Sequence, residues 1–152
     1  QRTEKDSMYE LSAKNDRLKL HGYLAHLPHY TEIHSPKYGV CVVTHPGIHC
    51  GSYIRNADRT INITESITNA VGRDEYRFLI SPDIHNVPFS DKKAFDRYVF
   101  CGHVTTNRLN EDHSYNAYVT SYYTDLDCGN GERNRGGKLA CYCVDDDSIF
   151  YI

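Results

Sequence analysis

Histidine is the residue type in this chain best suited to metal binding or proton transfer near neutral pH. Six of the nine histidines fall in the first third of the chain: His21, His26, His29, His34, His45 and His49. A spacing such as His26-x-x-His29 is compatible with zinc or copper ligation. The ordinary interpretation is a polar hairpin with solvent-facing histidines, and we favour it. We therefore expect no metal site and no cofactor.

The remaining histidines are His85, His103 and His113. One of them could be a displaced catalytic group, but we favour the interpretation that they are ordinary loop or surface histidines. One Gly-rich loop carries three cations, Arg133, Arg135 and Lys138. These side chains could contact phosphates or an acidic partner. The formal net charge of −3 gives no general attraction to nucleic acid, so we interpret this loop as solvated.

Tyrosine is unusually frequent, with 13 residues, and four of them cluster at Tyr115, Tyr118, Tyr122 and Tyr123. Aromatic rings of this kind can stack on bases of single-stranded nucleic acid. Tyrosine is also common in half-buried strands and in protein interfaces. We favour the second interpretation.

The six cysteines form an even set without a CxxC pair: Cys41, Cys50, Cys101, Cys128, Cys141 and Cys143. This pattern favours disulfides in an oxidising compartment over zinc binding. Asn62-Ile63-Thr64 is a glycosylation sequon, although Asn62 is also placed to cap a helix. The chain starts with Gln1 and not with Met, so we expect a mature form whose leader was removed. We therefore expect a secreted, extracellular glycoprotein.

The clearest helix signal covers residues 62–71. Ile63, Ile67, Ala70 and Val71 form one apolar stripe with a period of 3.6 residues. Asn62 is placed to cap the first turn, with Glu65 at the capping-box position and Gly72 just past the stripe. We therefore predict one short helix.

Most of the remaining chain has the pattern of strands and loops. The predicted strands are 38–44, 76–80, 95–104, 115–123 and 139–144, and 20–38 is a strand or hairpin. The middle of the segment 95–104 is apolar on both faces, as expected for a central strand. A length of 152 residues predicts a single domain over 1–152, with residues 1–45 as an N-terminal arm or hairpin extension. The fold class is therefore α+β, with one short helix packed on an antiparallel sheet.

Five short segments in this order carry a resemblance to a known family. They are His49-Cys50-Gly51-Ser52, Ser81-Pro82-Asp83 through Asn86, Phe95 to Phe100, Tyr115 to Tyr122, and Lys138 to Asp145. Their order and spacing resemble the guanyl-specific microbial ribonucleases, the fungal ribotoxins, and the ribonuclease-like secreted effectors of plant-pathogenic fungi. The resemblance implies a microbial ribonuclease-like fold with an extra N-terminal hairpin.

The same resemblance implies that the catalytic set is lost. The family uses a glutamate base and a histidine acid, assisted by a further Tyr or His and by an arginine over the phosphate. The matched positions fall on Asp83, Arg97, Tyr118 and Asp145, with His85 and Asp96 beside two of them. An aspartate is a poor proton donor at neutral pH, and no shift of alignment supplies both His and Arg. We interpret these six residues as degenerate cleft positions.

Our leading hypothesis is a secreted fungal virulence effector without ribonuclease activity. It would bind a host protein, such as a plant immune receptor or target, or RNA. We expect it to be a monomer that is extracellular or translocated into host cells. No apolar run approaches the roughly 20 residues of a membrane span, so we expect no membrane contact.

Two alternatives remain. One is an active secreted ribonuclease with rearranged residues. The other is an unrelated extracellular, disulfide-rich binding module. A fold without a helix packed across a four- or five-stranded antiparallel sheet would favour the second alternative.

Overall fold

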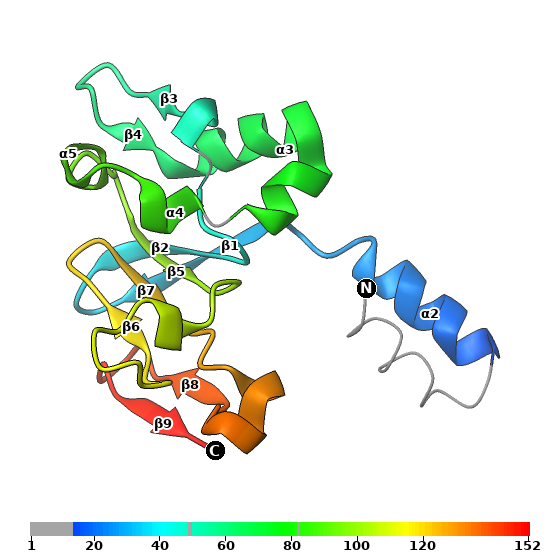
Figure 1. The fold of residues 1–152 in the computed structure, drawn as a ribbon. Helices are drawn as coiled ribbons and strands as arrows, with labels where there is room; N and C mark the ends of the chain where they lie inside the picture. Colours follow the sequence, from blue (N-terminus) through cyan, green and yellow to red (C-terminus); the bar gives the residue numbers. More distant parts are fainter. Residues whose placement is uncertain (1–13, 49, 82) are drawn as a thin grey trace.

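A five-stranded mixed sheet lies at the centre of the molecule (Figure 1). The computed structural model describes residues 14–48, 50–81 and 83–152. The strands, in spatial order, are β1 (Tyr30–Ser35), β2 (Gly39–Thr44), β5 (Tyr98–Cys101), β7 (Tyr123–Asp125) and β6 (Tyr118–Val119). The three central strands β2, β5 and β7 are parallel, and β1 and β6 are antiparallel to their neighbours. The α+β class is confirmed, but the antiparallel sheet was wrong.

The connection between β2 and β5 explains why these neighbours are parallel. Parallel neighbours need a long crossover, and this one carries most of the helical structure. It contains η1 (Cys50–Ser52), β3 (Ile54–Arg55), β4 (Ile61–Asn62), α3 (Ile63–Ile80), α4 (Asp83–Asn86) and α5 (Phe89–Lys92). The three helices and the β3–β4 hairpin gather on one side of the sheet (Figure 1). All four residues of β5 are buried, as a central strand of a parallel sheet requires.

The start of α3 agrees with the sequence analysis. The side-chain oxygen of Asn62 accepts a hydrogen bond of 3.0 Å from the backbone N–H of Glu65. Ile63, Ile67 and Ala70 are buried against the sheet. The predicted cap and apolar stripe are therefore confirmed.

The end of α3 differs from the prediction. The helix continues past Gly72 to Ile80, and its backbone is kinked at Asp74. Residues 76–80 are therefore helical, and the predicted strand there was wrong. Phe78 is buried in the main core, which gives the second helical segment its own anchor on the sheet. The apolar run after Asp74 was too short for its period to distinguish a strand from a helix.

The sheet carries a separate apolar cluster on each face. Val42, Val99 and Cys101 belong to the cluster that packs beneath α3. Cys41, Tyr98 and Phe100 form the cluster on the opposite face, together with the partly buried Tyr142. Alternation along β2 and β5 sends successive side chains to opposite faces, so the sheet is covered on both sides.

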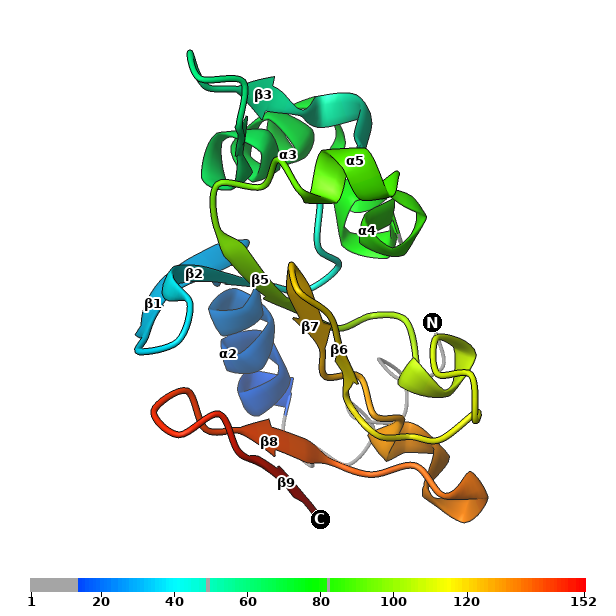
Figure 2. The same ribbon diagram turned by 90° about the vertical axis from the view of Figure 1, so that its left-hand side faces the viewer.

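The two ends of the described chain also differ from the predictions. Helix α2 (Lys14–Leu24) occupies part of the segment 20–38 that we predicted as a strand or hairpin, and it stands apart from the sheet (Figure 1). The expected hairpin is present as β1–β2, and β2 lies inside the main sheet. Strands β8 (Ala140–Tyr142) and β9 (Ile149–Tyr151) form a separate hairpin (Figure 2). The prediction that 139–144 is a core strand was therefore wrong.

Two other predicted strands are shorter than expected. The predicted strand 95–104 is observed only as β5, Tyr98–Cys101. The predicted strand 115–123 contains β6 and the start of β7, because a turn at Thr120 interrupts it. The Thr120 hydroxyl oxygen accepts hydrogen bonds from the backbone N–H groups of Tyr122 and Tyr123, at 3.2 Å and 3.0 Å. The loops on either side of this segment contain η2 (Thr106–Arg108) and η3 (Asn130–Arg135).

The predicted disulfides are not present among the described side chains. Cys41, Cys101, Cys128, Cys141 and Cys143 are all free thiols, and the first three are buried. Free buried cysteine behaves as a small apolar side chain, which explains its place in both core clusters.

The glycosylation sequon has a structural role. Asn62 is half-buried, and its Nδ2 donates to Asn56 Oδ1 at 3.1 Å while its oxygen caps α3. A glycan on Nδ2 would have to displace the contact with Asn56.

In the residues that the structure describes, no helix combines the length and apolar character that crossing a bilayer requires.

Candidate functional site

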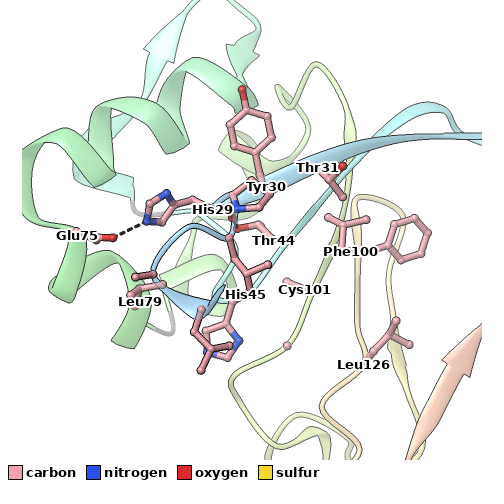
Figure 3. Close-up of a pocket in the computed structure, with 16 residues that line it drawn as sticks. His29, Tyr30, Thr31, Thr44, His45, Glu75, Leu79, Phe100, Cys101 and Leu126 are labelled. Atoms are coloured by element: carbon pink, nitrogen blue, oxygen red, sulfur yellow. Dashed lines mark hydrogen bonds and ion pairs between the residues drawn. The ribbon is translucent and has the colours of Figure 1, made fainter. Parts of the chain in front are cut away.

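A cavity of about 750 Å³ lies at the carboxyl ends of the parallel strands (Figure 3). Thr44 and His45 line it at the end of β2, Cys101 and Gly102 at the end of β5, and Leu126 after β7. The carboxyl edge of parallel strands is where open sheets commonly bind ligands. The volume lies within the range of small-molecule pockets.

The wall of this cavity is mainly apolar. Val43, Phe100 and Leu126 contribute from the sheet and the loop after β7. Leu79 of α3 and Leu27 of the α2–β1 connection contribute from outside the sheet. Both Leu27 and Leu79 are exposed, at 44% and 37% of their surface. The cavity therefore opens to solvent along an apolar border.

A polar contact fixes one side of the cavity. His29 Nε2 lies 2.8 Å from Glu75 Oε1, and this contact joins the α2–β1 connection to α3 (Figure 3). The hydroxyl of Thr44 donates to the carbonyl oxygen of His29 at 3.0 Å. These two contacts hold the connection against β2 and α3. The cavity wall is thus supported by hydrogen bonds as well as by packing.

A pair of histidine rings supplies the polar chemistry at the strand ends. His45 Nε2 lies 3.1 Å from His103 Nδ1, and His103 Nε2 lies 3.0 Å from the carbonyl oxygen of Ile80. A carbonyl only accepts, so His103 Nε2 carries a proton. With both rings neutral, His103 Nδ1 accepts from His45 Nε2–H. His45 Nδ1 then retains a lone pair that can accept a hydrogen bond.

The surroundings of His45 favour this neutral form. Burial of the ring lowers the pKa of His45, and the neighbouring His103 lowers it further, while Asp127 and Asp125 partly oppose this. His45 nevertheless remains exposed to solvent as a residue. His103 adopts a φ of 78°, a left-handed conformation that is uncommon for a residue other than glycine. Such strained backbone recurs at binding and catalytic sites.

A second histidine cluster lies nearby but is closed. His85 Nδ1 lies 3.1 Å from the Tyr123 hydroxyl, and His85 Nε2 lies 3.0 Å from Asp125 Oδ2. The His85 and Asp125 side chains expose only 8% and 0% of their surface. The contact between them is close but not aligned as a hydrogen bond, so its attraction is mainly electrostatic. Asp125 Oδ1 accepts from the backbone N–H of Asp127 at 2.8 Å.

Burial shifts the pKa values of three groups around this closed cluster. Burial raises the pKa of Tyr123 and lowers that of Lys92, whose ammonium lies 5.2 Å from the centre of the Tyr123 ring. Burial, followed by repulsion from Asp125, raises the pKa of the Cys101 thiol well above its usual value. The contacts of His85 with Tyr123 and Asp125 attach α4 to β7. The high pKa of Cys101 disfavours the reactive thiolate form. It offers no open position for a ligand among its described contacts.

The residues that the sequence analysis proposed as a degenerate cleft do not form one site. Asp83 is the first residue of α4, and His85 lies in the closed cluster. The Tyr118 ring lies 6.0 Å from that of Tyr123, beside this cluster. Asp145 is exposed in the turn between β8 and β9.

Asp96 and Arg97 lie together at the start of β5, at the opposite end of this strand from the cavity. Asp96 Oδ1 accepts from the backbone N–H of Ile63 at 3.0 Å and so helps to cap α3. Arg97 forms an ion pair with Glu32 of β1. Both residues therefore have structural partners.

The loop cations and tyrosines also make local contacts. Arg133 Nε donates to Asn130 at 2.9 Å, and Lys138 Nζ donates to Asn116 at 2.8 Å. The hydroxyl of Tyr115, a buried residue, donates to Glu132 at 2.7 Å. These contacts stabilise the loop around η3. Within the described part of the chain, no group of three or more His, Cys, Asp or Glu side chains is arranged to hold a metal ion.

The sequence analysis missed Asp125 and the pairing of His45 with His103. One signal could have found them. His45 and His103 follow two apolar strands within two residues, and Asp125 ends a third. Parallel strands bring such positions to one edge. The antiparallel prediction placed them at opposite edges and hid the site.

Three comparisons with known proteins give no relationship from which a function could be transferred. No protein-family model matches the chain, and no curated protein and no solved structure is significantly similar to it.

Proposed function

We propose that this domain binds a small, mainly apolar molecule that carries a hydrogen-bond donor, in the cavity at the carboxyl ends of β2 and β5. The observation that carries the proposal is the position of this cavity of about 750 Å³, with His45 among its lining residues. Its Nδ1 keeps a lone pair when both rings of the His45–His103 pair are neutral. This function belongs to the class of binding modules that the sequence left as an alternative. The mixed sheet supports that class over the ribonuclease-like one.

The chemistry of the lining selects the ligand. Leu79, Phe100 and Leu126 favour an aliphatic or aromatic body, because burying apolar surface contributes about 25 cal/mol per Å². The neutral His45 offers an acceptor, so a hydroxyl or N–H on the ligand is favoured over an ether or carboxylate. Glu75 lines the same cavity and disfavours anions.

A matched pair of probes tests this selection. We expect 4-butylphenol to bind more tightly than 4-butylanisole, which has a similar shape but lacks the hydroxyl donor. A net hydrogen bond of about 1 kcal/mol corresponds to a difference of about fivefold in Kd. Isothermal titration calorimetry measures both affinities. Equal affinities would refute the role of His45, and absence of binding by both probes would refute the proposal.

Two variants of α3 locate the binding site. Leu79→Arg places a charge at the cavity border and should abolish binding of 4-butylphenol. Tyr76→Arg is the control, because Tyr76 lies on the same helix, is 72% exposed and does not line the cavity. It should bind 4-butylphenol as the wild type does.

We also propose that the domain does not cleave RNA. Ribonuclease chemistry of the kind implied by the resemblance needs a base, an acid and a cation around one phosphate. The separation of His85, Arg97 and Asp145 supports the proposal. Incubation with total RNA should give no turnover. Cleavage that is lost in His85→Ala or Asp96→Ala would overturn this proposal.

The secreted, host-directed role remains a proposal that rests on the resemblance. The five free thiols remove the disulfide argument for an extracellular location. We propose secretion and binding to a host protein as the setting in which the domain acts. Detection of the protein in culture medium tests the first part. Retention in the producing cell would refute it.

A further inference from the structure

The two edges of the main sheet are very different. Edge strand β6 has two residues, whereas edge strand β1 has six and pairs with β2 over its whole length. Short edge strands resist pairing with another chain, while long regular ones present a row of free backbone N–H and C=O groups. β1 contains no proline and its register with β2 has no bulge. It is therefore the edge at which another strand can add.

The side chains of β1 are complementary to themselves about Ile33. In an antiparallel pair centred on this residue, Ile33 lies opposite Ile33 of a second copy. Glu32 lies opposite His34, and this pair occurs twice because of the two-fold axis. Ser35, at the end of β1, is buried within its own copy and lies outside the pairing. Directly opposed residues point to the same face, so each Glu–His pair can make a cross-strand contact.

We propose that two copies of this chain associate through β1, by antiparallel pairing about a two-fold axis at Ile33. The two five-stranded sheets then form one continuous sheet. This proposal departs from the monomer that the sequence led us to expect. It does not depend on the ligand-binding function, because it uses the edge of the sheet and not the cavity.

The contacts within one copy leave the side chains of the two Glu32–His34 pairs available. Glu32 and His34 are exposed, and Ile33 is partly exposed while it packs against the cluster with Tyr98 and Phe100. Glu32 uses Oε1 for its ion pair with Arg97, which leaves Oε2 for a histidine of the second copy. No hydrogen-bond or ion-pair partner of the His34 ring lies among the described residues.

The charge pattern makes pairing in this register specific. Charged residues on an edge strand usually prevent association, because like charges meet. Here the register centred on Ile33 brings opposite charges together when His34 is protonated, and an acceptor–donor pair when it is neutral. A register shifted by two residues brings Glu32 opposite Glu32, so repulsion disfavours it.

Sedimentation equilibrium of the whole chain at submillimolar concentration tests the proposal. The wild type should form a dimer. His34→Glu should raise the dimer dissociation constant by about tenfold or more, because two attractive pairs become two repulsive ones. The double variant Glu32→His with His34→Glu restores opposite charges and should restore the dimer.

Two controls make each outcome decisive. Val119→Glu places a charge on the short edge strand β6, where the side chain is 51% exposed, and should leave association unchanged. Circular dichroism verifies that each variant is folded. A monomeric wild type, or a dimer that is insensitive to His34→Glu, would overturn the proposal. Loss of the dimer in Val119→Glu alone would assign the interface to the other edge.

Discussion

The two histidine clusters at the carboxyl edge of the sheet contain similar groups but differ in access. His85 has both ring nitrogens against protein groups, Tyr123 and Asp125, and exposes 8% of its side chain. His45 has one ring nitrogen, Nε2, in a hydrogen bond with His103, and it lines a cavity of about 750 Å³. The first cluster attaches α4 to the sheet, and the second is the one that we propose binds a ligand. Residue type alone therefore does not distinguish an enclosed structural histidine from one that borders a cavity.

The largest effect should come from opening the closed cluster. Asp125→Ala leaves His85 buried without its carboxylate and removes the acceptor of the Asp127 N–H. Breaking a buried pair costs about 3–5 kcal/mol, so the free energy of unfolding should fall by that amount. Urea denaturation measures it.

A neighbouring aspartate provides the control. Asp127 is partly exposed and accepts from the backbone N–H of Gly129 at 3.2 Å, so Asp127→Ala should cost only about 1 kcal/mol. Equal losses in the two variants would mean that the His85 cluster is no more important for stability than a surface loop.

The next largest effect on the free energy of unfolding should come from the contact between Gly47, near the open cluster of His45, and Ile84, near the closed cluster of His85. Gly47 follows His45 with a φ of 86°, and a Cβ placed on it would lie 2.6 Å from Ile84 Cβ, next to His85. Gly47→Ala should cost about 2–4 kcal/mol, from backbone strain and overpacking.

Gly39 is the matched control for this substitution. Its φ is 71°, but no atom lies within 4 Å of the added Cβ. Gly39→Ala should therefore cost only the backbone strain, about 1–2 kcal/mol. The difference between the two variants measures the clash with α4, and no difference would contradict close packing of Gly47 on Ile84.

Removing the acceptor of the open cluster should have a smaller effect, on binding more than on stability. His45→Phe keeps a ring at the cavity border but removes the lone pair. The preference for 4-butylphenol over 4-butylanisole, about fivefold in the wild type, should disappear. Calorimetry on the variant gives both affinities. A preserved preference would assign donor recognition to another residue.

The smallest effect should be a difference in pH dependence. The pKa of His45 in the folded state lies below its unfolded value of 6.5, so the unfolded chain binds the proton first as pH falls. The stability that His45 contributes is complete above about pH 6.5 and is lost as pH falls through the folded-state pKa. Between about pH 7.5 and 5, the wild type should lose more unfolding free energy than His45→Gln. An identical loss would contradict the environment described for His45.

Local signals in the sequence predicted local structure well. The cap at Asn62 and the stripe from Ile63 to Ala70 depend on residues within three turns of one another, so they could be read directly. The helix end could not be predicted in this way. Gly72 lies within α3, where the buried Phe78 anchors a second segment beyond the kink at Asp74.

The direction of the strands depends on contacts that no short segment contains. The apolar character of β5 on both faces was recognised, but it was assigned to an antiparallel sheet. The contact between His85 and Asp125 joins residues 40 positions apart through α4 and β7. The site could therefore be predicted only after the parallel arrangement of β2, β5 and β7 was known. Helix α2 lacks an amphipathic pattern, which explains why it was missed.

The most direct test of the account is to follow 4-butylphenol binding by backbone and histidine-ring chemical shifts in the whole chain. The account predicts saturable shifts at His45, Leu79 and Phe100, with the ring of His85 unchanged. Saturable shifts at His85 with none at His45, or no saturable shifts at any residue, would contradict it.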